Sequence, residues 1–88
     1  MKLSKNFVLR QVADTWVVLP LAQDTVNFNG VIRLNGSGAL LWQCLEQGGD
    51  RQALVKTLTD RYTVSLEEAE KDVEEFLQIL AKTGCLEL

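Results

Sequence analysis

Hydrophobic residues recur with two different spacings along the chain, first at every second position and later at helical intervals. Residues 7–13 alternate between two faces, and residues 16–21 follow as a second, almost continuously apolar segment. Both patterns are typical of β-strands. Asp14 and Thr15 between them predict a two-residue turn, so we expect an antiparallel hairpin. Pro20 has no amide hydrogen, so pairing is expected to end or to bulge there.

Residues 30–42 join a third predicted strand to the first predicted helix. Ile32 and Leu34 are two residues apart and therefore share one face of a strand at residues 30–34. After a short polar hinge, residues 37–47 are apolar on almost every side, which predicts a buried helix. The side chains expected to be buried in it are Ala39, Leu40, Leu41, Trp42, Cys44 and Leu45. Strands therefore precede this junction and helices follow it.

Two further helices are predicted after the junction. Asp50 is a good N-cap for a second helix, which ends near Tyr62. Ser65 with Glu68 three residues later is a capping box that opens a third helix. Gly84 closes the third helix, and the last four residues are expected to continue as an extended tail. All 88 residues are therefore expected to form one α+β domain with the element order βββααα.

The third helix has a wider apolar arc than packing against a core requires. At about 100° per residue, one stripe of apolar side chains would suffice for that packing. Its members are Leu66, Ala69, Val73, Leu77 and Leu80. Phe76 and Ile79 lie beside the stripe, on the flank that also holds Asp72 and Thr83. Either another element of the protein covers this flank, or the flank is one wall of an open hydrophobic groove for a ligand.

Composition excludes several classes of function. The hydrophobic fraction of 47% is ordinary for a soluble globular protein, and no apolar run approaches the roughly 20 residues of a membrane span. The N-terminus lacks the apolar core of a signal peptide, so a cytoplasmic location is expected. Because the chain has no histidine, no nucleophile can be paired with the usual base, and we expect no catalysis, no metal and no cofactor. Cys44 and Cys85 are interpreted as buried, reduced thiols.

Charge opposes a role in binding nucleic acid. A small sheet with three helices invites comparison with winged helix-turn-helix DNA-binding proteins, which need clustered lysine and arginine to bind phosphates. The net charge of this chain is −3, and the third helix carries many more carboxylates than lysines. We therefore expect neither a nucleic acid nor a membrane as partner.

The sequence resembles a known family. Residues 30–42 have the pattern G-V-I-x-L-N-x-x-G-x-x-x-W, and Tyr62-x-Val64 precedes the acidic third helix. That helix contributes Ala69, Asp72, Val73, Phe76, Leu77 and Leu80 to the pattern. The pattern is similar to the PqqD-like family from about residue 16 to the C-terminus. The family's namesake serves pyrroloquinoline quinone biosynthesis. The same domain is the recognition element of many pathways that make ribosomally synthesised, post-translationally modified peptides.

The resemblance implies a winged helix-turn-helix-like fold, with a three-stranded antiparallel sheet followed by three helices, that binds the leader segment of a precursor peptide. The leader adds as a strand beside the third strand and packs against the third helix. The peptide-binding residues that this implies are Val31, Ile32, Arg33, Asp72, Phe76, Ile79 and Thr83. Arg33 and Asp72 would recognise charges on the peptide.

The resemblance also implies a second partner. The family's namesake delivers its peptide to a radical S-adenosylmethionine enzyme, so a non-catalytic adaptor that presents a precursor peptide to a separate modifying enzyme is the leading hypothesis. An adaptor of this kind raises the local concentration of substrate at the enzyme. The alternatives are an interaction domain of the same fold whose partner is another protein, and a DNA-binding regulator.

Overall fold

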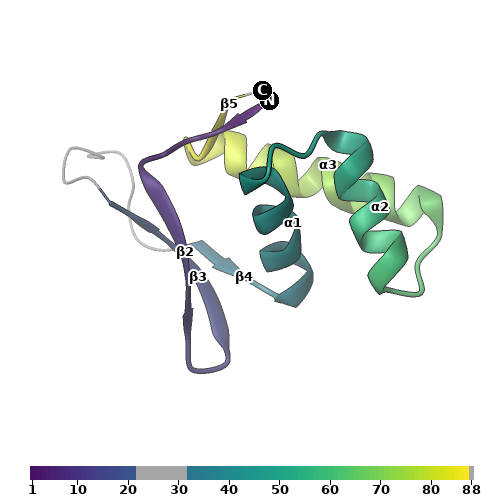
Figure 1. The fold of residues 1–88 in the computed structure, drawn as a ribbon, viewed down its shortest axis with the longest axis horizontal. Helices are drawn as coiled ribbons and strands as arrows, with labels where there is room; N and C mark the ends of the chain where they lie inside the picture. Colours follow the sequence, from purple (N-terminus) through teal and green to yellow (C-terminus); the bar gives the residue numbers. More distant parts are fainter. Residues whose placement is uncertain (22–31, 88) are drawn as a thin grey trace.

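The computed structural model describes residues 1–21 and 32–87, which contain a three-stranded antiparallel sheet followed by three helices. The strands of this sheet are β2 (Phe7–Val12), β3 (Thr15–Pro20) and β4 (Ile32–Leu34). The helices are α1 (Gly36–Glu46), α2 (Arg51–Arg61) and α3 (Leu66–Lys82). The helices gather on one side of the β2–β3 hairpin (Figure 1). The α+β fold class and the order of three strands and three helices are therefore confirmed.

β3 is the central strand of the sheet, and β2 and β4 flank it. Leu9 of β2 and Ile32 of β4 both lie opposite Val18 of β3. Because side chains alternate along a strand, residues in this row point to the same face of the sheet. Val18 is fully buried, and Leu9 and Ile32 pack against the core. This face of the sheet therefore meets the helices.

The hairpin turn lies one residue earlier than the sequence predicts. Val12 lies opposite Thr15, so the turn is formed by Ala13 and Asp14, and β2 ends before Ala13. Ala13 has a φ of 56°, which is the left-handed region that glycine usually fills in such turns. Without a glycine to mark it, the turn has no clear signal in the sequence. Of the predicted third strand, Gly30 and Val31 lie outside the described residues.

Side-chain caps fix where the helices begin. The carboxylate of Asp50 accepts a hydrogen bond from the amide of Ala53 at 2.9 Å, and the hydroxyl of Ser65 accepts one from the amide of Glu68 at 3.1 Å. Asn35 caps α1 in the same way at 2.8 Å. Each cap pairs an amide of the first turn that has no partner within the helix. The predicted caps at Asp50 and Ser65 are confirmed.

The hydrophobic core lies between the sheet and the helices, with Trp42 of α1 fully buried within it. The other α1 residues that are buried as expected are Ala39, Leu41 and Leu45. Leu40 and Cys44 are only half-buried, which corrects the expectation of an almost wholly buried helix. Both flank the side of α1 that carries the exposed Gln43, so this helix does have a solvent-facing side.

A second, two-stranded sheet brings the two ends of the described chain together. β1 (Lys2–Leu3) pairs antiparallel with β5 (Leu86–Glu87), so the predicted tail is a strand that starts at Leu86. Cys85 and Leu86 are buried in the core, and Figure 1 shows the two termini side by side. Burial raises the pKa of the Cys85 thiol and keeps it in the neutral form. Cys85 and the half-buried Cys44 are both free thiols.

Candidate functional site

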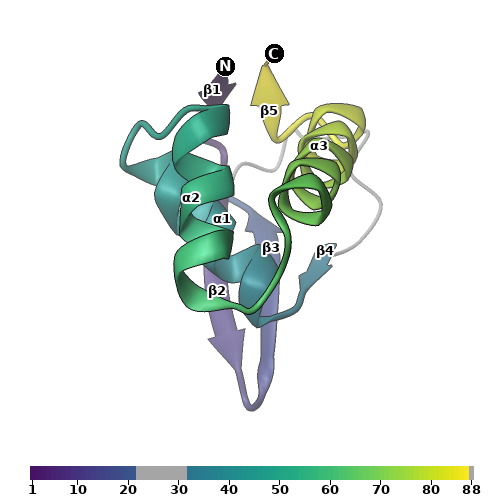
Figure 2. The ribbon, with the colours of Figure 1, turned by 90° about the vertical axis from the view of Figure 1, so that its right-hand side faces the viewer.

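Strand β4 is the last strand of the sheet order β2-β3-β4. β3 pairs with one side of β4, and within residues 1–21 and 32–87 no strand pairs with its other side. Figure 2 shows β4 on the same side of the molecule as α3, and Figure 1 shows it next to α1, which it contacts. Ile32 points to the core face, whereas the exposed Arg33 points to the opposite face of the sheet. Backbone amides and carbonyls on such an edge can pair with an incoming strand. Val31, which was also predicted here, lies outside the described residues.

The predicted helix residues occupy one flank of α3, but they differ in exposure. Asp72 is exposed and Ile79 is 52% exposed, so both are accessible to a ligand. Phe76 is 9% exposed and belongs to the core. The expectation that Phe76 stands beside the packed stripe is therefore wrong. Leu66 of the same stripe is 61% exposed at the first residue of α3. The other stripe members are buried, so the buried face of α3 extends beyond the stripe to include Phe76.

Thr83 lies at the C-terminal end of the same flank, and its hydroxyl is already engaged. The hydroxyl oxygen lies 3.1 Å from the carbonyl oxygens of Ile79 and Leu80 and 3.4 Å from the sulfur of Cys85. Threonine hydroxyls commonly bond in this way to the preceding turn of their own helix. The hydroxyl is therefore occupied by its own helix, and a ligand on this flank would meet Thr83 mainly through its methyl group.

Arg33 and Asp72 each have an exposed charge. Neither forms an ion pair with any described residue, since the pairs present are Arg51 with Glu74 and Lys56 with Asp60. Arg33 projects from the face of β4 opposite Ile32, and Asp72 projects from α3. A peptide bound along the edge of β4 would therefore have Arg33 on one side and Asp72 on the other.

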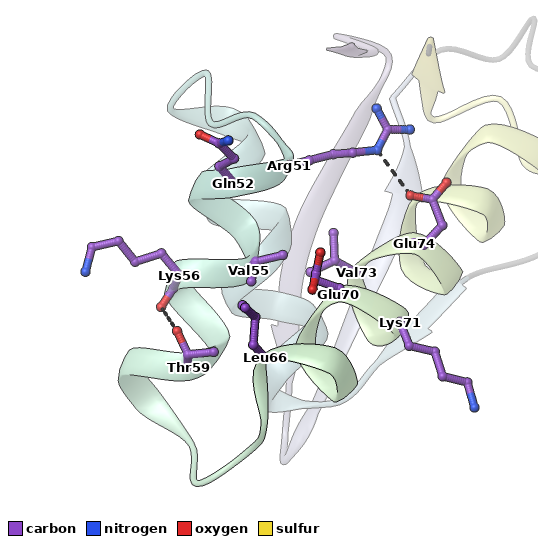
Figure 3. A pocket seen from close by; sticks show the side chains of 10 residues that line it. All are labelled: Arg51, Gln52, Val55, Lys56, Thr59, Leu66, Glu70, Lys71, Val73 and Glu74. Atoms are coloured by element: carbon purple, nitrogen blue, oxygen red, sulfur yellow. Dashed lines mark hydrogen bonds and ion pairs between the residues drawn. The ribbon is translucent and has the colours of Figure 1, made fainter.

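A separate groove of about 720 Å³ lies between α2 and α3 (Figure 3). Val55 and Leu66 form apolar walls, and an ion pair between Arg51 and Glu74 (3.1 Å) spans the groove at one end. Hydrogen bonds from Arg51 and then Gln78 hold the pKa of the Glu74 carboxyl below its usual value. None of the predicted peptide-binding residues lines this groove. α3 therefore presents two separate flanks, one beside β4 and one beside α2.

Residues 1–21 and 32–87 contain neither a cluster of metal-binding side chains nor a membrane-spanning helix. No group of three or more cysteine, aspartate or glutamate side chains gathers closely enough to hold a metal ion among these residues. None of the helices formed by these residues has the length and apolar character needed to cross a membrane.

The sheet, with β4 as its last strand, and the three helices define a small α+β domain of the winged helix-turn-helix-like class. A family model described as coenzyme PQQ synthesis protein D (PqqD) matches residues 15–86. The chain belongs to this PqqD family, which confirms the resemblance found in the sequence.

Two solved structures are similar to the chain over nearly their whole length. The first is TbiB1 in complex with the TbiA(beta) leader peptide, with 29% sequence identity and a TM-score of 0.81. The similarity covers 99% of this chain and 95% of the TbiB1 chain. The second is a lasso peptide synthetase B1 complexed with the leader peptide, with 24% identity, a TM-score of 0.76 and coverage of 94% and 92%. No curated protein matches the sequence.

Proposed function

We propose that this protein is a non-catalytic adaptor that binds the leader segment of a ribosomally made precursor peptide and presents it to a modifying enzyme. The observation that carries the proposal is the edge of β4 that no described strand pairs with, on the same side of the molecule as α3 and its partly exposed flank. An extended peptide that pairs with this edge becomes a fourth strand of the sheet. It would satisfy its backbone hydrogen bonds on β4 and place alternate side chains towards α3.

The apolar part of the proposed contact is centred on Ile79. Its side chain is 52% exposed, so a peptide side chain can cover it without displacing core residues. Phe76 lies one turn earlier and is 9% exposed, so it supports the flank from below and offers only a small surface to the peptide. An apolar leader residue packed on Ile79 would provide the desolvated contact that commonly dominates peptide affinity.

The two exposed charges would recognise opposite faces of the bound strand. Side chains of the added strand alternate, as they do in β4. Those on the outer face of the sheet would lie next to Arg33, and those on the helix side would lie towards Asp72. An acidic leader residue beside Arg33 and a basic one beside Asp72 would each add a favourable cross-strand or surface pair of about 0.2–1 kcal/mol.

The comparisons support this assignment at the level of the family and of a neighbour. TbiB1, which was solved with a leader peptide bound, shares 29% identity and nearly the whole fold with this chain. Membership of the PqqD family agrees with the same role. We assign the modifying enzyme to the radical S-adenosylmethionine class by analogy with the family's namesake, and we place the adaptor in the cytoplasm, where ribosomal precursors are made.

Titration calorimetry and hydrogen exchange together test the proposal. The ligand is any short peptide found to be encoded beside the gene of this protein, and the control is a scrambled peptide of the same composition. We expect saturable binding of the first peptide only, with protection of the amides of residues 32–34 from exchange. Equal binding of the scrambled peptide, or protection confined to other elements, would contradict strand addition at β4.

A further inference from the structure

The sheet has a second face, turned away from the helices, that the proposed function leaves largely unused. Figure 1 shows α1, α2 and α3 on one side of the β2–β3 hairpin. The register of the strands places a second set of side chains on the opposite side. We call this set the outer sheet face, and its members are Val8, Arg10, Val12, Thr15, Val17, Leu19, Leu21 and Arg33.

The outer sheet face is mainly apolar. Val17 is 9% exposed but is not part of the core cluster that contains its neighbour Val18. Val12 and Leu21 are 59% and 63% exposed. Leu21 extends the register beyond β3, because its amide donates a hydrogen bond of 2.7 Å to the carbonyl of Asn6. Val8 and Leu19 are half-buried, so the exposed apolar surface of this face lies at Val12 and Leu21.

The charges on this face are all of one sign. Arg10, Val17 and Arg33 lie in one row across the three strands. Adjacent strands are about 4.8 Å apart, so the backbones that carry the two arginines are separated by roughly 10 Å. Neither arginine forms an ion pair with a described residue, and no described residue of the face is acidic. The face therefore carries two positive charges on a chain whose net charge is −3.

We propose that the outer sheet face docks an acidic amphipathic helix of a partner protein. An α-helix rises about 1.5 Å per residue, so glutamates seven residues apart lie roughly 10.5 Å apart on the same side of the helix. That spacing matches the separation of Arg10 and Arg33. Leucines three and four residues after the first glutamate would lie between the two carboxylates, over Val17. The charge row sets the position of the helix, and the exposed Val12, in the next row of this face, supplies apolar contact area.

Other anionic partners fit this face less well. Binding to a lipid headgroup layer through charge requires clusters of about four to eight lysines and arginines, and DNA binding also requires clustered cations. The outer sheet face offers two cations, and the remainder of the chain is acidic. An amphipathic helix needs only the two charges and an exposed apolar side chain beside them, such as Val12.

The docked helix and a leader strand would occupy different places. The leader pairs with the free edge of β4, beyond Arg33, and leaves Arg10, Val12 and Leu21 uncovered. In the adaptor role proposed above, the acidic helix would belong to the modifying enzyme. The docking itself does not depend on that role, because it rests on the composition and register of the outer sheet face alone.

The test uses a synthetic helical peptide with glutamates seven residues apart and leucines three and four residues after the first. It is titrated into the isotope-labelled full chain and followed by nuclear magnetic resonance. We expect saturable shifts of amides in β2 and β3 and an affinity that falls as salt rises. The double variant Arg10→Glu, Arg33→Glu should bind about tenfold more weakly. A matched double variant on α3, Lys71→Glu with Lys82→Glu, has the same net charge and should retain the affinity.

Several outcomes would overturn the proposal. These are equal binding of a peptide with lysines in place of the glutamates, shifts confined to the helices, and equal loss of affinity in the α3 double variant. Absence of peptide binding also overturns it. If the chain then binds vesicles of phosphatidylcholine and phosphatidylglycerol, the face is assigned to a membrane. If the arginine variant does not fold, the salt dependence of the unaltered chain serves as the test. An affinity that does not change with salt would overturn the proposal.

Discussion

Ile79 and Phe76 stand three residues apart on α3, and their surroundings give them different roles. Ile79 is 52% exposed and Phe76 is 9% exposed. We expect Ile79→Ala to leave the melting temperature close to that of the unaltered protein, because little buried surface is lost. The same substitution should weaken leader binding at least about tenfold, since truncating an interface anchor commonly costs about 2 kcal/mol. Thermal unfolding and titration calorimetry on the same variant measure both effects.

Phe76→Ala and Leu77→Ala provide the comparison for Ile79. Leu77 is fully buried, and its truncation should cost about 2–5 kcal/mol of unfolding free energy. Phe76→Ala should cost about 3–5 kcal/mol, because Phe76 is also part of the core. Loss of stability in Ile79→Ala as large as in these two variants would place Ile79 in the core and remove it from the proposed binding surface.

Ala13 carries a local strain that a single substitution should relieve. With a φ of 56°, its side chain lies close to the backbone in a conformation that costs an L-residue about 1–2 kcal/mol. Glycine has no such penalty but loses about 0.4–1 kcal/mol through its more flexible unfolded state. We therefore expect Ala13→Gly to raise the unfolding free energy by about 0.5–1 kcal/mol in chemical denaturation. An Ala13→Val control should lower it, because a β-branched side chain increases the strain.

At the scale of secondary-structure elements, the ion pair between Arg51 and Glu74 joins α2 to α3 across their groove. Hydrogen bonding to Arg51 lowers the pKa of Glu74 in the folded state, so folding favours its ionised form. The resulting stabilisation is complete above the unfolded-state pKa of about 4.3 and is lost as the pH falls through the lower folded-state pKa. Both side chains are about half exposed, so the effect is small.

Glu74→Gln tests this interaction through its pH dependence. The variant should melt slightly below the unaltered protein at neutral pH, and the difference should disappear under acid conditions, where Glu74 is protonated in both states. Glu75→Gln is a suitable control, because Glu75 is also exposed in the middle of α3 and has no ion pair with a described residue. A melting difference that persists in acid would show that the pair does not account for the effect of the substitution.

An element could be predicted from the sequence where the residues that determine it lie close together in the chain. Asp50 and Ser65 could be identified as caps because a cap depends on two residues three positions apart. The pairing of β1 with β5 could not be predicted, since two-residue strands have no period and their partners lie at opposite ends of the sequence. The turn at Ala13 was misplaced by one residue because alanine gives no signal for a left-handed conformation.

The candidate site was predictable only in part for the same reason. Its position along β4 and α3 came from the family resemblance, and the exposure of Ile79 agrees with the apolar arc seen in the sequence. The burial of Phe76 depends on how α3 rotates against the sheet and α2, which helical periodicity leaves undetermined. The outer sheet face was also missed, because alternation shows that two faces exist but not which residues share a row across three strands.

At the scale of the whole molecule, charge distribution predicts the absence of DNA binding. The net charge is −3, α3 is acidic, and the outer sheet face has only two arginines. We expect no shift of duplex DNA in a gel at low micromolar protein and physiological salt, because phosphate binding requires clustered cations. A basic DNA-binding protein in the same gel is the control. A shift that weakens with rising salt would favour transcriptional regulation over the adaptor role.

The pairing of β1 with β5 also sets an order of events during synthesis. Residues 2–3 leave the ribosome well before their strand partners at residues 86–87, which are made more than eighty positions later. The hairpin and the first two helices can form on the nascent chain, but the core surface covered by Cys85 and Leu86 stays exposed until translation has passed them. A transcript truncated a few codons early would therefore yield an incompletely closed core, which is the kind of surface that chaperones and proteases recognise.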